Sequence, residues 1–176
     1  MNKATISLIK FYESLHDGDL TTIGLQPKMD PLGIWTEGYG RAMINPATKE
    51  FLKGAPNKDL ALKLASIHTE EEACTALDAD LKRYATIAAN KVGAINWGKL
   101  NANQQGALTS FVYNCGTGVP QYKIFLNIVN YLKGTMSQQA LIDYWKESVV
   151  RGGGVRLPGL VKRRAKEAQL FFAPLV

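Results

Sequence analysis

The chain has 176 residues, of which 46% are hydrophobic and 20% charged, and its net charge is +6. This composition predicts one soluble globular domain with a core that needs neither disulfides nor metal, and no segment reaches the roughly 18 apolar residues that span a bilayer. Residues 151–176 carry six basic residues and one acid. Such a basic end fits an acidic partner (nucleic acid, anionic lipid or wall polymer) or a solvated helix face without a partner.

The cysteines and histidines give little sign of metal or redox chemistry. Cys74 and Cys115 fit no zinc or redox spacing, and we expect two buried free thiols unless the protein reaches an oxidising compartment. His16 and His68 lack metal-ligand spacing and are interpreted as ordinary residues. Neither a metal nor a cofactor is expected. Residues 1–17 lack the apolar run of a signal peptide, so we expect synthesis in the cytoplasm.

The first helix is predicted over Lys3–Leu15 by apolar residues at three- and four-residue spacing, with Gly18 ending it. Glu13 falls near its C-terminal end, where the helix dipole disfavours a carboxylate and favours the neutral acid. Residues 19–57 are rich in Gly, Pro, Asp and Asn. They predict a small β-hairpin or three-stranded sheet.

The rest of the chain predicts helices, and two of them have capping patterns. Thr69 and Glu72 have the spacing of a capping box, as do Asn101 and Gln104, and Gly116 is expected to close the second of these helices. Helices are predicted over residues 69–92, 101–115, 121–134, 137–149 and 160–172, with a loop at 151–159.

Carboxylates are the remaining candidates for catalysis, because no Ser lies in a nucleophile-elbow motif and residues 151–159 lack a phosphate-loop signature. Hydrolysis of a glycosidic bond needs one protonated acid and one ionised carboxylate. Glu13, among apolar neighbours, suits the first role, although a Glu at such a position is usually a solvent-facing helix residue. The second carboxylate is open among Asp17, Asp19 and Asp30. Asp17, one helical turn after Glu13, is expected to lie too close to it along the same helix face, and Asp19, beside Gly18, is interpreted as a turn residue.

Three segments, in this order, resemble the phage-type lysozymes, or endolysins, of glycoside hydrolase family 24. They are Glu13 followed by DPLGIWTEGYG (30–40), SFVYNCGTGV (110–119) and LPGLVKRRAKEAQLF (157–171). The resemblance covers nearly the whole chain. It implies an α+β, mostly helical, lysozyme-like two-lobed fold, with a small β-hairpin or sheet lobe and a larger helical lobe around a cleft.

The same resemblance implies the domain organisation. We expect a single catalytic domain over residues 1–176, without a separate cell-wall-binding domain. The small lobe would cover about residues 16–68, the helical lobe 1–15 and about 92–176, and the linking helix about 69–91.

The resemblance also implies the reaction and its residues. The family hydrolyses the β-1,4 bond between N-acetylmuramic acid and N-acetylglucosamine in peptidoglycan. Glu13 would be the general acid, Asp30 would position or activate the attacking water, and Thr36 would help to hold that water. The substrate-binding residues implied are Tyr39, Arg41, Tyr113 and Asn114.

Two features depart from the family pattern. The family has eight residues between its Glu and its Asp, whereas sixteen, Ser14 to Met29, intervene here, and Thr22 stands at the family's Asp position. Asp30 is favoured because it alone keeps the D-P-x-G-x-x-T context, which makes the extra residues a lip on the cleft. Arg41 and Glu37 stand where the family has a His and an apolar residue. Either the two side chains pair with each other across the turn, or Arg41 contacts the substrate.

Two other functions fit the sequence. One is a lytic transglycosylase that uses Glu13 alone, and the other is a non-catalytic basic module that binds wall polymer or nucleic acid. The favoured hypothesis is a monomeric endolysin without nucleic-acid binding. Its partner is peptidoglycan, which it reaches in the periplasm by holin-dependent release.

The C-terminal helix is basic on one side and apolar on the other. Arg163 and Arg164 are expected to serve structure or attraction to the wall. The helix has a possible weak attraction to anionic membrane, but its apolar side is expected to pack against the helical lobe. That side consists of Leu160, Val161, Ala165, Ala168 and Phe172.

Overall fold

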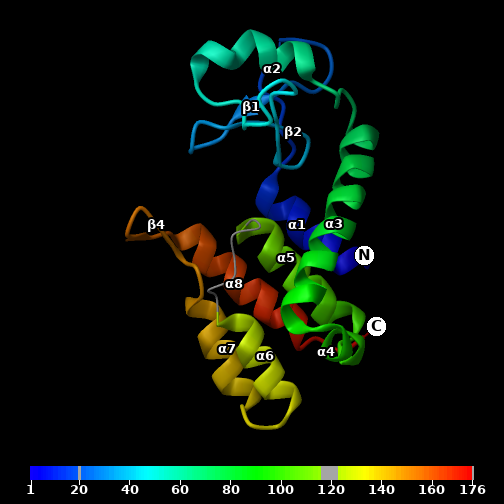
Figure 1. The fold of residues 1–176 in the computed structure, drawn as a ribbon, viewed down its shortest axis with the longest axis vertical. Helices are drawn as coiled ribbons and strands as arrows, with labels where there is room; N and C mark the ends of the chain where they lie inside the picture. The colour runs from blue at the N-terminus through cyan, green and yellow to red at the C-terminus, as the bar shows by residue number, and fades with distance from the viewer. Residues whose placement is uncertain (20, 116–122, 176) are drawn as a thin grey trace. The chain divides into compact units, whose positions relative to one another are not determined.

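The computed structural model describes residues 1–19, 21–115 and 123–175, and within them it is mostly helical with a small antiparallel sheet (Figure 1). The predicted fold class is therefore confirmed. In chain order the elements are α1 (Lys3–Glu13), β1 (Lys28–Met29), β2 (Trp35–Glu37), β3 (Arg41–Ala42), the 3-10 helix η1 (Ala55–Asn57), α2 (Lys58–Leu64), α3 (Glu70–Val92), α4 (Ala94–Lys99), α5 (Ala102–Cys115), α6 (Ile124–Leu132), α7 (Gln138–Glu147), β4 (Arg151–Gly152), β5 (Val155–Arg156) and α8 (Pro158–Phe171).

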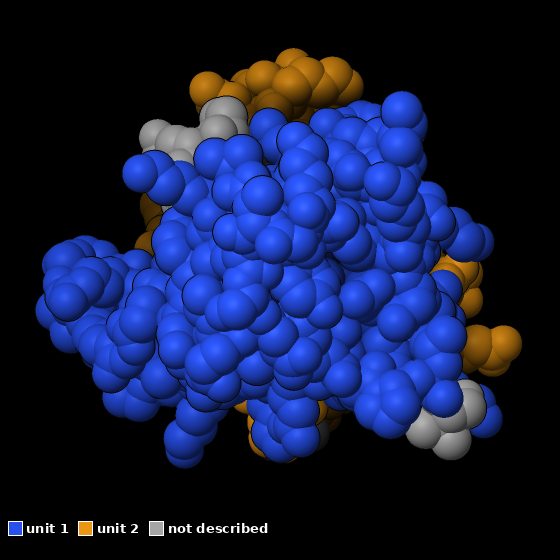
Figure 2. Space-filling model, turned by 90° about the horizontal axis from the view of Figure 1, so that it is seen from below, with its two compact units in different colours: residues 1–9, 81–176 blue, residues 10–80 orange. Residues whose placement is uncertain are grey.

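The chain divides into two compact units, coloured separately in Figure 2. Unit 2 comprises Lys10–Asp80 and contains the sheet β1–β2–β3 with η1 and α2. Unit 1 comprises Met1–Ile9 and Leu81–Val176, and contains α4 to α8 with the hairpin β4–β5. The helices α1 and α3 each contribute residues to both units. In the part of the chain that the structure describes, no helix is long and apolar enough to cross a membrane.

Unit 2 has its own small core beneath the sheet. The central strand β2 pairs antiparallel with β1 and with β3, and all three of its residues are buried. Trp35 packs with Met43, Leu52 and Ala61, and the last of these lies on α2. Neither η1 nor α2 is predicted from the sequence, because a seven-residue helix makes only about two turns, which is too short to establish a helical period.

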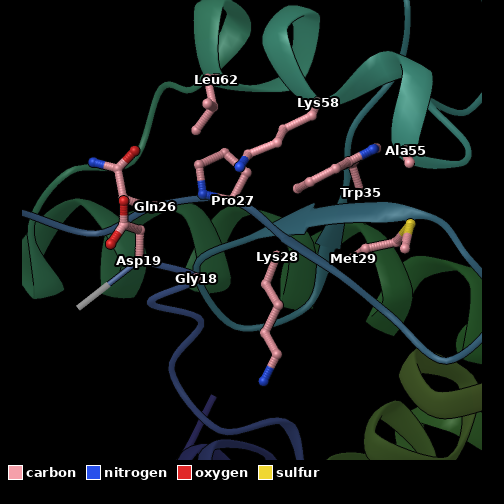
Figure 3. Close-up of a pocket in the computed structure, with 10 residues that line it drawn as sticks. All are labelled: Gly18, Asp19, Gln26, Pro27, Lys28, Met29, Trp35, Ala55, Lys58 and Leu62. Carbon is pink, nitrogen blue, oxygen red and sulfur yellow. The ribbon is translucent and has the colours of Figure 1, made fainter. Parts of the chain in front are cut away.

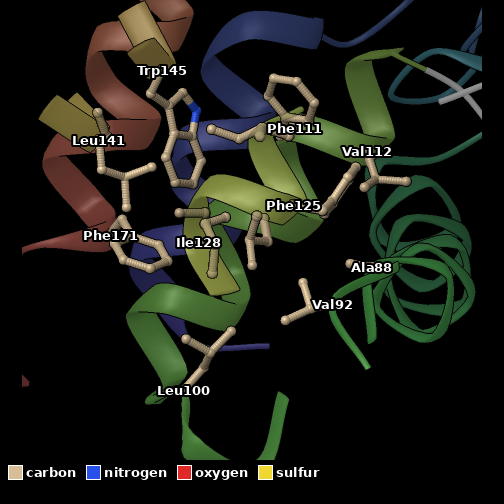
Figure 4. Packing of buried hydrophobic residues seen from close by; sticks show 14 residues of the cluster. Ala88, Val92, Leu100, Phe111, Val112, Phe125, Ile128, Leu141, Trp145 and Phe171 are labelled. Carbon is tan, nitrogen blue, oxygen red and sulfur yellow. The ribbon is translucent and has the colours of Figure 1, made fainter. Parts of the chain in front are cut away.

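Unit 1 is built around buried aromatic rings from four helices (Figure 4). The ring of Phe111 on α5 meets those of Phe125 on α6 and Trp145 on α7 edge to face, each with centroids 6.2 Å apart. Trp145 also lies 5.2 Å from Phe171 on α8. Edge contacts suit the aromatic quadrupole, and together with the tilted Trp145–Phe171 pair they join α5, α6, α7 and α8 in one core. The helix α8 therefore packs within the helical unit, as predicted, but mainly through another face. Its buried residues are Arg163, Arg164, Glu167, Ala168 and Phe171, whereas Leu160, Val161, Ala165 and Phe172 of the predicted apolar side are half-buried.

Three charged side chains of α8 are buried in unit 1. Arg163, Arg164 and Glu167 are at most 3% exposed. Both arginines bind the Glu167 carboxylate, which also accepts hydrogen bonds from the Ser110 hydroxyl at 2.8 Å and the Trp145 indole N–H at 3.3 Å. The structural role is therefore confirmed for this arginine pair, and attraction to the wall is excluded because neither guanidinium reaches solvent.

The local capping predictions are confirmed. Thr69 and Glu72 exchange hydrogen bonds between each side chain and the other's main-chain N–H, and Asn101 and Gln104 do the same. The predicted cap Gly116 lies outside the described residues. The predicted loop at 151–159 is partly wrong, because it contains the hairpin of β4 and β5.

The two cysteines are free thiols, as expected, but they are only half-buried. Burial raises the pKa of the Cys115 thiol to about 11, so it stays protonated at neutral pH. An unreactive thiol of this kind contributes to packing, not to chemistry.

Candidate active site

Glu13 is the last residue of α1, where the chain turns sharply. Ser14 adopts a left-handed conformation (φ 56°), and its N–H closes the helix on the Lys10 carbonyl at 3.1 Å. The helix therefore ends two residues before the predicted Leu15. The Glu13 side chain is half-buried and lies against Gly40, where an added Cβ would be 2.9 Å from Oε2.

His16 connects this turn to the sheet. Its main-chain N–H donates to the Gly38 carbonyl at 2.8 Å, an isolated antiparallel bridge beside the β2–β3 turn. Its ring Nδ1 lies 3.0 Å from the hydroxyl of Thr36. The interpretation of His16 as an ordinary residue is thus incomplete. The only signal in the sequence is its position three residues after Glu13, in the connection that is longer than the family pattern.

Thr36 lies in the central strand β2 and is 4% exposed. Its Oγ1 is 2.9 Å from the main-chain carbonyl oxygen of Lys28, its register partner on β1. The hydroxyl is therefore held between the carbonyl of Lys28 and the ring of His16.

Asp30 shapes the turn between β1 and β2. Its Oδ1 accepts hydrogen bonds from the main-chain N–H groups of Leu32 and Ile34, both at 2.8 Å. Gly33 in the same turn has a φ of 76° and donates to the Asp30 carbonyl at 2.9 Å. The D-P-x-G segment is thus a turn whose first residue holds its carboxylate in a defined place.

The electrostatics bring the two carboxylates together at His16. Burial lowers the pKa of the His16 ring below its usual 6.5, and the positive charge of Lys28 acts in the same direction. Glu13, through its charge and its main chain, and Asp30, through its charge, oppose this shift in pKa. His16 is therefore neutral at neutral pH, and Glu13 and Asp30 both lie close enough to act on one ring.

The longer connection after Glu13 is folded back on itself. Gly18 donates to the Gln26 carbonyl and Leu25 to the His68 carbonyl, both at 3.0 Å. Asp19 caps a turn by accepting from Thr21 N–H at 3.0 Å, which agrees with its interpretation as a turn residue. Asp17 lies beyond the end of α1, so its expected place on the helical face of Glu13 is wrong.

This connection also lines a hollow of about 400 Å³ in unit 2 (Figure 3). Lys58 and Leu62 extend from α2 toward Pro27, while Lys28 points away from α2. Trp35 forms part of the same wall. The hollow is mainly apolar, with charge supplied by exposed side chains at its rim.

Tyr39 and Arg41, both predicted to bind substrate, have partners inside unit 2. The Tyr39 hydroxyl donates to Glu70 at 3.2 Å, and its ring is 6% exposed. The Arg41 guanidinium binds Asp80 through Nε at 2.8 Å and the Ala76 carbonyl through Nη2 at 2.9 Å. These contacts hold β3 and its preceding turn to α3.

Arg41 and Glu37, expected as one alternative to pair with each other, bind other partners. Although the two residues face each other in the β2–β3 register, the Glu37 carboxylate accepts hydrogen bonds from Ser66 N–H and hydroxyl at 2.8 Å and from Ile67 N–H at 3.2 Å. Glu37 is 6% exposed, so it ties β2 to the segment before α3 instead of meeting solvent.

Tyr113 and Asn114, the other predicted substrate residues, end α5 in unit 1. The ring of Tyr113 meets Tyr84 edge to face at 5.0 Å, and Asn114 accepts a hydrogen bond from Arg164. Both residues are half-buried, and their contact with substrate stays a prediction. Within residues 1–19, 21–115 and 123–175, no three His, Cys, Asp or Glu side chains gather as a metal site would require.

Solved structures with a similar fold include a muramidase domain and phage endolysins. The muramidase domain of SpmX from Asticaccaulis excentricus has a TM-score of 0.64 and 24% identity, covering 98% of this chain and 97% of that one. The endolysin from Escherichia coli O157:H7 phage FAHEc1 has a TM-score of 0.64 and 23% identity, covering 97% and 92%. At these identities the likeness defines the fold, which is that of the lysozyme class.

The sequence comparisons define the family. A curated endolysin of Acyrthosiphon pisum secondary endosymbiont phage 1 is 26% identical over 164 residues, which are 93% of this chain and 92% of the relative. The model of the phage lysozyme family matches residues 19–167. The chain belongs to the phage lysozyme family, and its activity is that of a lysozyme. The matched range contains Asp30 and Thr36 and begins after Glu13.

Proposed function

We propose that this lysozyme hydrolyses the β-1,4 bond between N-acetylmuramic acid and N-acetylglucosamine of peptidoglycan, with Glu13 and Asp30 as its two carboxylates. The observation that carries the proposal is geometric: in unit 2 the Glu13 carboxylate lies against Gly40 of the β2–β3 turn, and the Asp30 carboxylate is held in the β1–β2 turn by two main-chain N–H groups. Two carboxylates around a shared site are what glycoside hydrolysis requires.

Glu13 is the general acid in this proposal. Its carboxyl group is half-buried at the C-terminal end of α1, against Gly40 of the β2–β3 turn. A protonated carboxyl group can donate its proton to the leaving glycosidic oxygen. Gly40, with no side chain, leaves room for the carboxyl group in that position.

Asp30 takes the proton of the attacking water in this proposal. Its Oδ1 is held by two main-chain N–H groups of the turn, which fixes the position of the carboxylate. Oδ2 is the atom we assign to the water. An inverting reaction follows if the two carboxyl groups are about 6.5–9.5 Å apart, since that separation leaves room for a water molecule.

The biological setting follows from the proposed substrate. We propose that the chain acts as an endolysin, released by a holin-type pore to reach peptidoglycan in the periplasm, as a monomer. Tyr113 and Asn114 are the proposed contacts to sugar. The exposed basic residues at the C-terminal end suit an anionic wall better than the buried Arg163 and Arg164 do.

The test uses the purified protein on isolated peptidoglycan and on chloroform-treated Gram-negative cells. Glu13→Gln should abolish lysis while circular dichroism and the unfolding midpoint stay close to the original, and Glu50→Gln, an exposed control in the same unit, should retain lysis. Retained lysis in Glu13→Gln would exclude the assignment.

Mass spectrometry of the products decides the type of cleavage. Reducing N-acetylmuramic acid ends support hydrolysis with Asp30 and water. 1,6-Anhydro ends would instead show a lytic transglycosylase that depends on Glu13 alone.

A further inference from the structure

The hydroxyl group of Thr36 has two polar neighbours and only one proton. The carbonyl oxygen of Lys28, 2.9 Å away, can only accept a hydrogen bond, so the hydroxyl proton must point to it. The second neighbour, Nδ1 of His16 at 3.0 Å, must then supply its own proton to the hydroxyl oxygen. The neutral imidazole is thus the tautomer with the proton on Nδ1, and Nε2 carries none.

We infer that His16 is a positioning residue, whose Nδ1–H fixes the Thr36 hydroxyl as a hydrogen-bond acceptor for the attacking water. This inference rests on the proposed hydrolysis. A hydroxyl oxygen has two acceptor lone pairs, and Nδ1–H occupies one of them. The other lone pair receives one hydrogen of the water while Asp30 receives the other. Both lone pairs of the water then remain for attack on the sugar.

The main chain holds His16 in the position that this role needs. The left-handed conformation of Ser14 sets the direction of the chain just before His16. The hydrogen bond from His16 N–H to the Gly38 carbonyl at 2.8 Å then fixes the residue to the β2–β3 turn. The residue comes from the connection between Glu13 and Asp30 that is longer than the family pattern. His16 is the third residue of this connection, so the start of the connection supplies a side chain to the site.

The hydrogen bond from the His16 ring to Thr36 does not depend on whether the ring is neutral or protonated. The charges of Lys28 on β1, Glu13 on α1 and Asp30 in the β1–β2 turn act on the ring, and the main-chain carbonyl of Glu13 also accepts a hydrogen bond from it. When pH falls, the ring gains a proton at Nε2 and keeps the one at Nδ1. The bond to Thr36 therefore survives protonation of the ring, and it depends on the Nδ1–H group alone.

The first measurement is the tautomer of the ring in the wild-type protein. The nitrogen-15 chemical shifts of His16 at neutral pH should show a protonated Nδ1 and an unprotonated Nε2. The opposite tautomer would overturn the inference, whatever the activity of the protein.

The second measurement compares two substitutions of similar size. Asn places an amide N–H close to the position of Nδ1–H, whereas Leu places no donor there. His16→Asn should keep kcat on isolated peptidoglycan near the wild-type value. His16→Leu should lower kcat about tenfold to a hundredfold with little change in KM, because a misplaced water affects the reaction rather than binding.

A double substitution separates positioning from packing. If His16 acts through Thr36, then adding Thr36→Val to His16→Leu should lower kcat much less than the same change does in the wild type. Fully additive losses of kcat in the double variant would overturn the inference about His16 but not the proposed hydrolysis. A wild-type kcat in a folded His16→Leu protein would do the same. A wild-type protein without hydrolytic activity would instead overturn the proposed function on which it rests.

Discussion

Gly40 lies directly against the carboxylate of Glu13: a Cβ at this position would be 2.9 Å from Oε2. Gly40 also has a φ of 82°, in the left-handed region that L side chains rarely adopt. The glycine of the β2–β3 turn is therefore required both by its own backbone and by the neighbouring acid, which is the proposed proton donor.

Gly40→Ala should lower hydrolytic activity about tenfold to a hundredfold, because the Glu13 carboxyl group must move to make room. Strain at the positive φ should also lower the free energy of unfolding by about 1–2 kcal/mol. Gly134→Ala is the matched control, since Gly134 has a φ of 74° and no heavy atom within 4 Å of an added Cβ. It should lose similar stability and retain activity. Equal activity of the two variants in a reducing-sugar assay would contradict this prediction.

Asp30→Asn distinguishes the structural role of Asp30 in the β1–β2 turn from its proposed role in catalysis. The amide oxygen of Asn can still accept the N–H groups of Leu32 and Ile34, so the turn and the unfolding midpoint should change little. Hydrolysis should fall by at least about a hundredfold, because an amide cannot take a proton from water. Asp19→Asn keeps the equivalent bond to Thr21 N–H and should retain activity. A larger loss in Asp19→Asn would mean that another acid of the longer connection acts with Glu13.

Arg164→Met should destabilise the protein by about 3–5 kcal/mol, because it removes one partner of a fully buried ion pair with Glu167. The exposed neighbour Lys162 is the control, and Lys162→Met should change the free energy of unfolding by less than about 0.5 kcal/mol. Urea denaturation followed by circular dichroism measures both values. Similar stability of the two variants would show that the buried cluster contributes little.

Stability should depend on the titration of His16. The unfolded ring takes up its proton near the ordinary pKa of 6.5, and the folded ring does so only at a lower pH, because its pKa is lowered mainly by burial. Between these two values the unfolded chain binds more protons, so the free energy of unfolding rises with pH. The contribution of His16 to the free energy of unfolding should therefore fall as pH drops below about 6.5. It should stop falling once the pH is below the pKa of the folded ring.

Urea unfolding of the wild type and His16→Asn at a series of pH values measures this contribution. The variant lacks the ring, so the difference between the two curves should change within that window and level off on either side. A constant difference across the window would mean that the pKa of His16 is the same in the folded and unfolded chains.

Local rules explain where prediction from the sequence succeeds. The pairs Thr69–Glu72 and Asn101–Gln104 each join residues three apart, so the hydrogen bonds depend on helix geometry alone. The long helices are predicted for a similar reason, because their apolar period repeats several times. The two-residue strands β4 and β5 have no period to detect, and their hairpin depends on tight turn glycines.

The amino-acid pattern predicts the fold class, the long helices and the family motifs around Glu13, Asp30 and Thr36, because these depend on local periodicity and on short residue patterns. The contacts of His16 with Thr36 and of Arg41 with Asp80 emerge from the folded chain alone, since they join residues 20 and 39 positions apart. The burial of Arg163 and Arg164 is likewise a property of the folded chain. Charge in a sequence predicts solvent exposure, and only packing against Glu167 and Ser110 stabilises these guanidinium groups in the core.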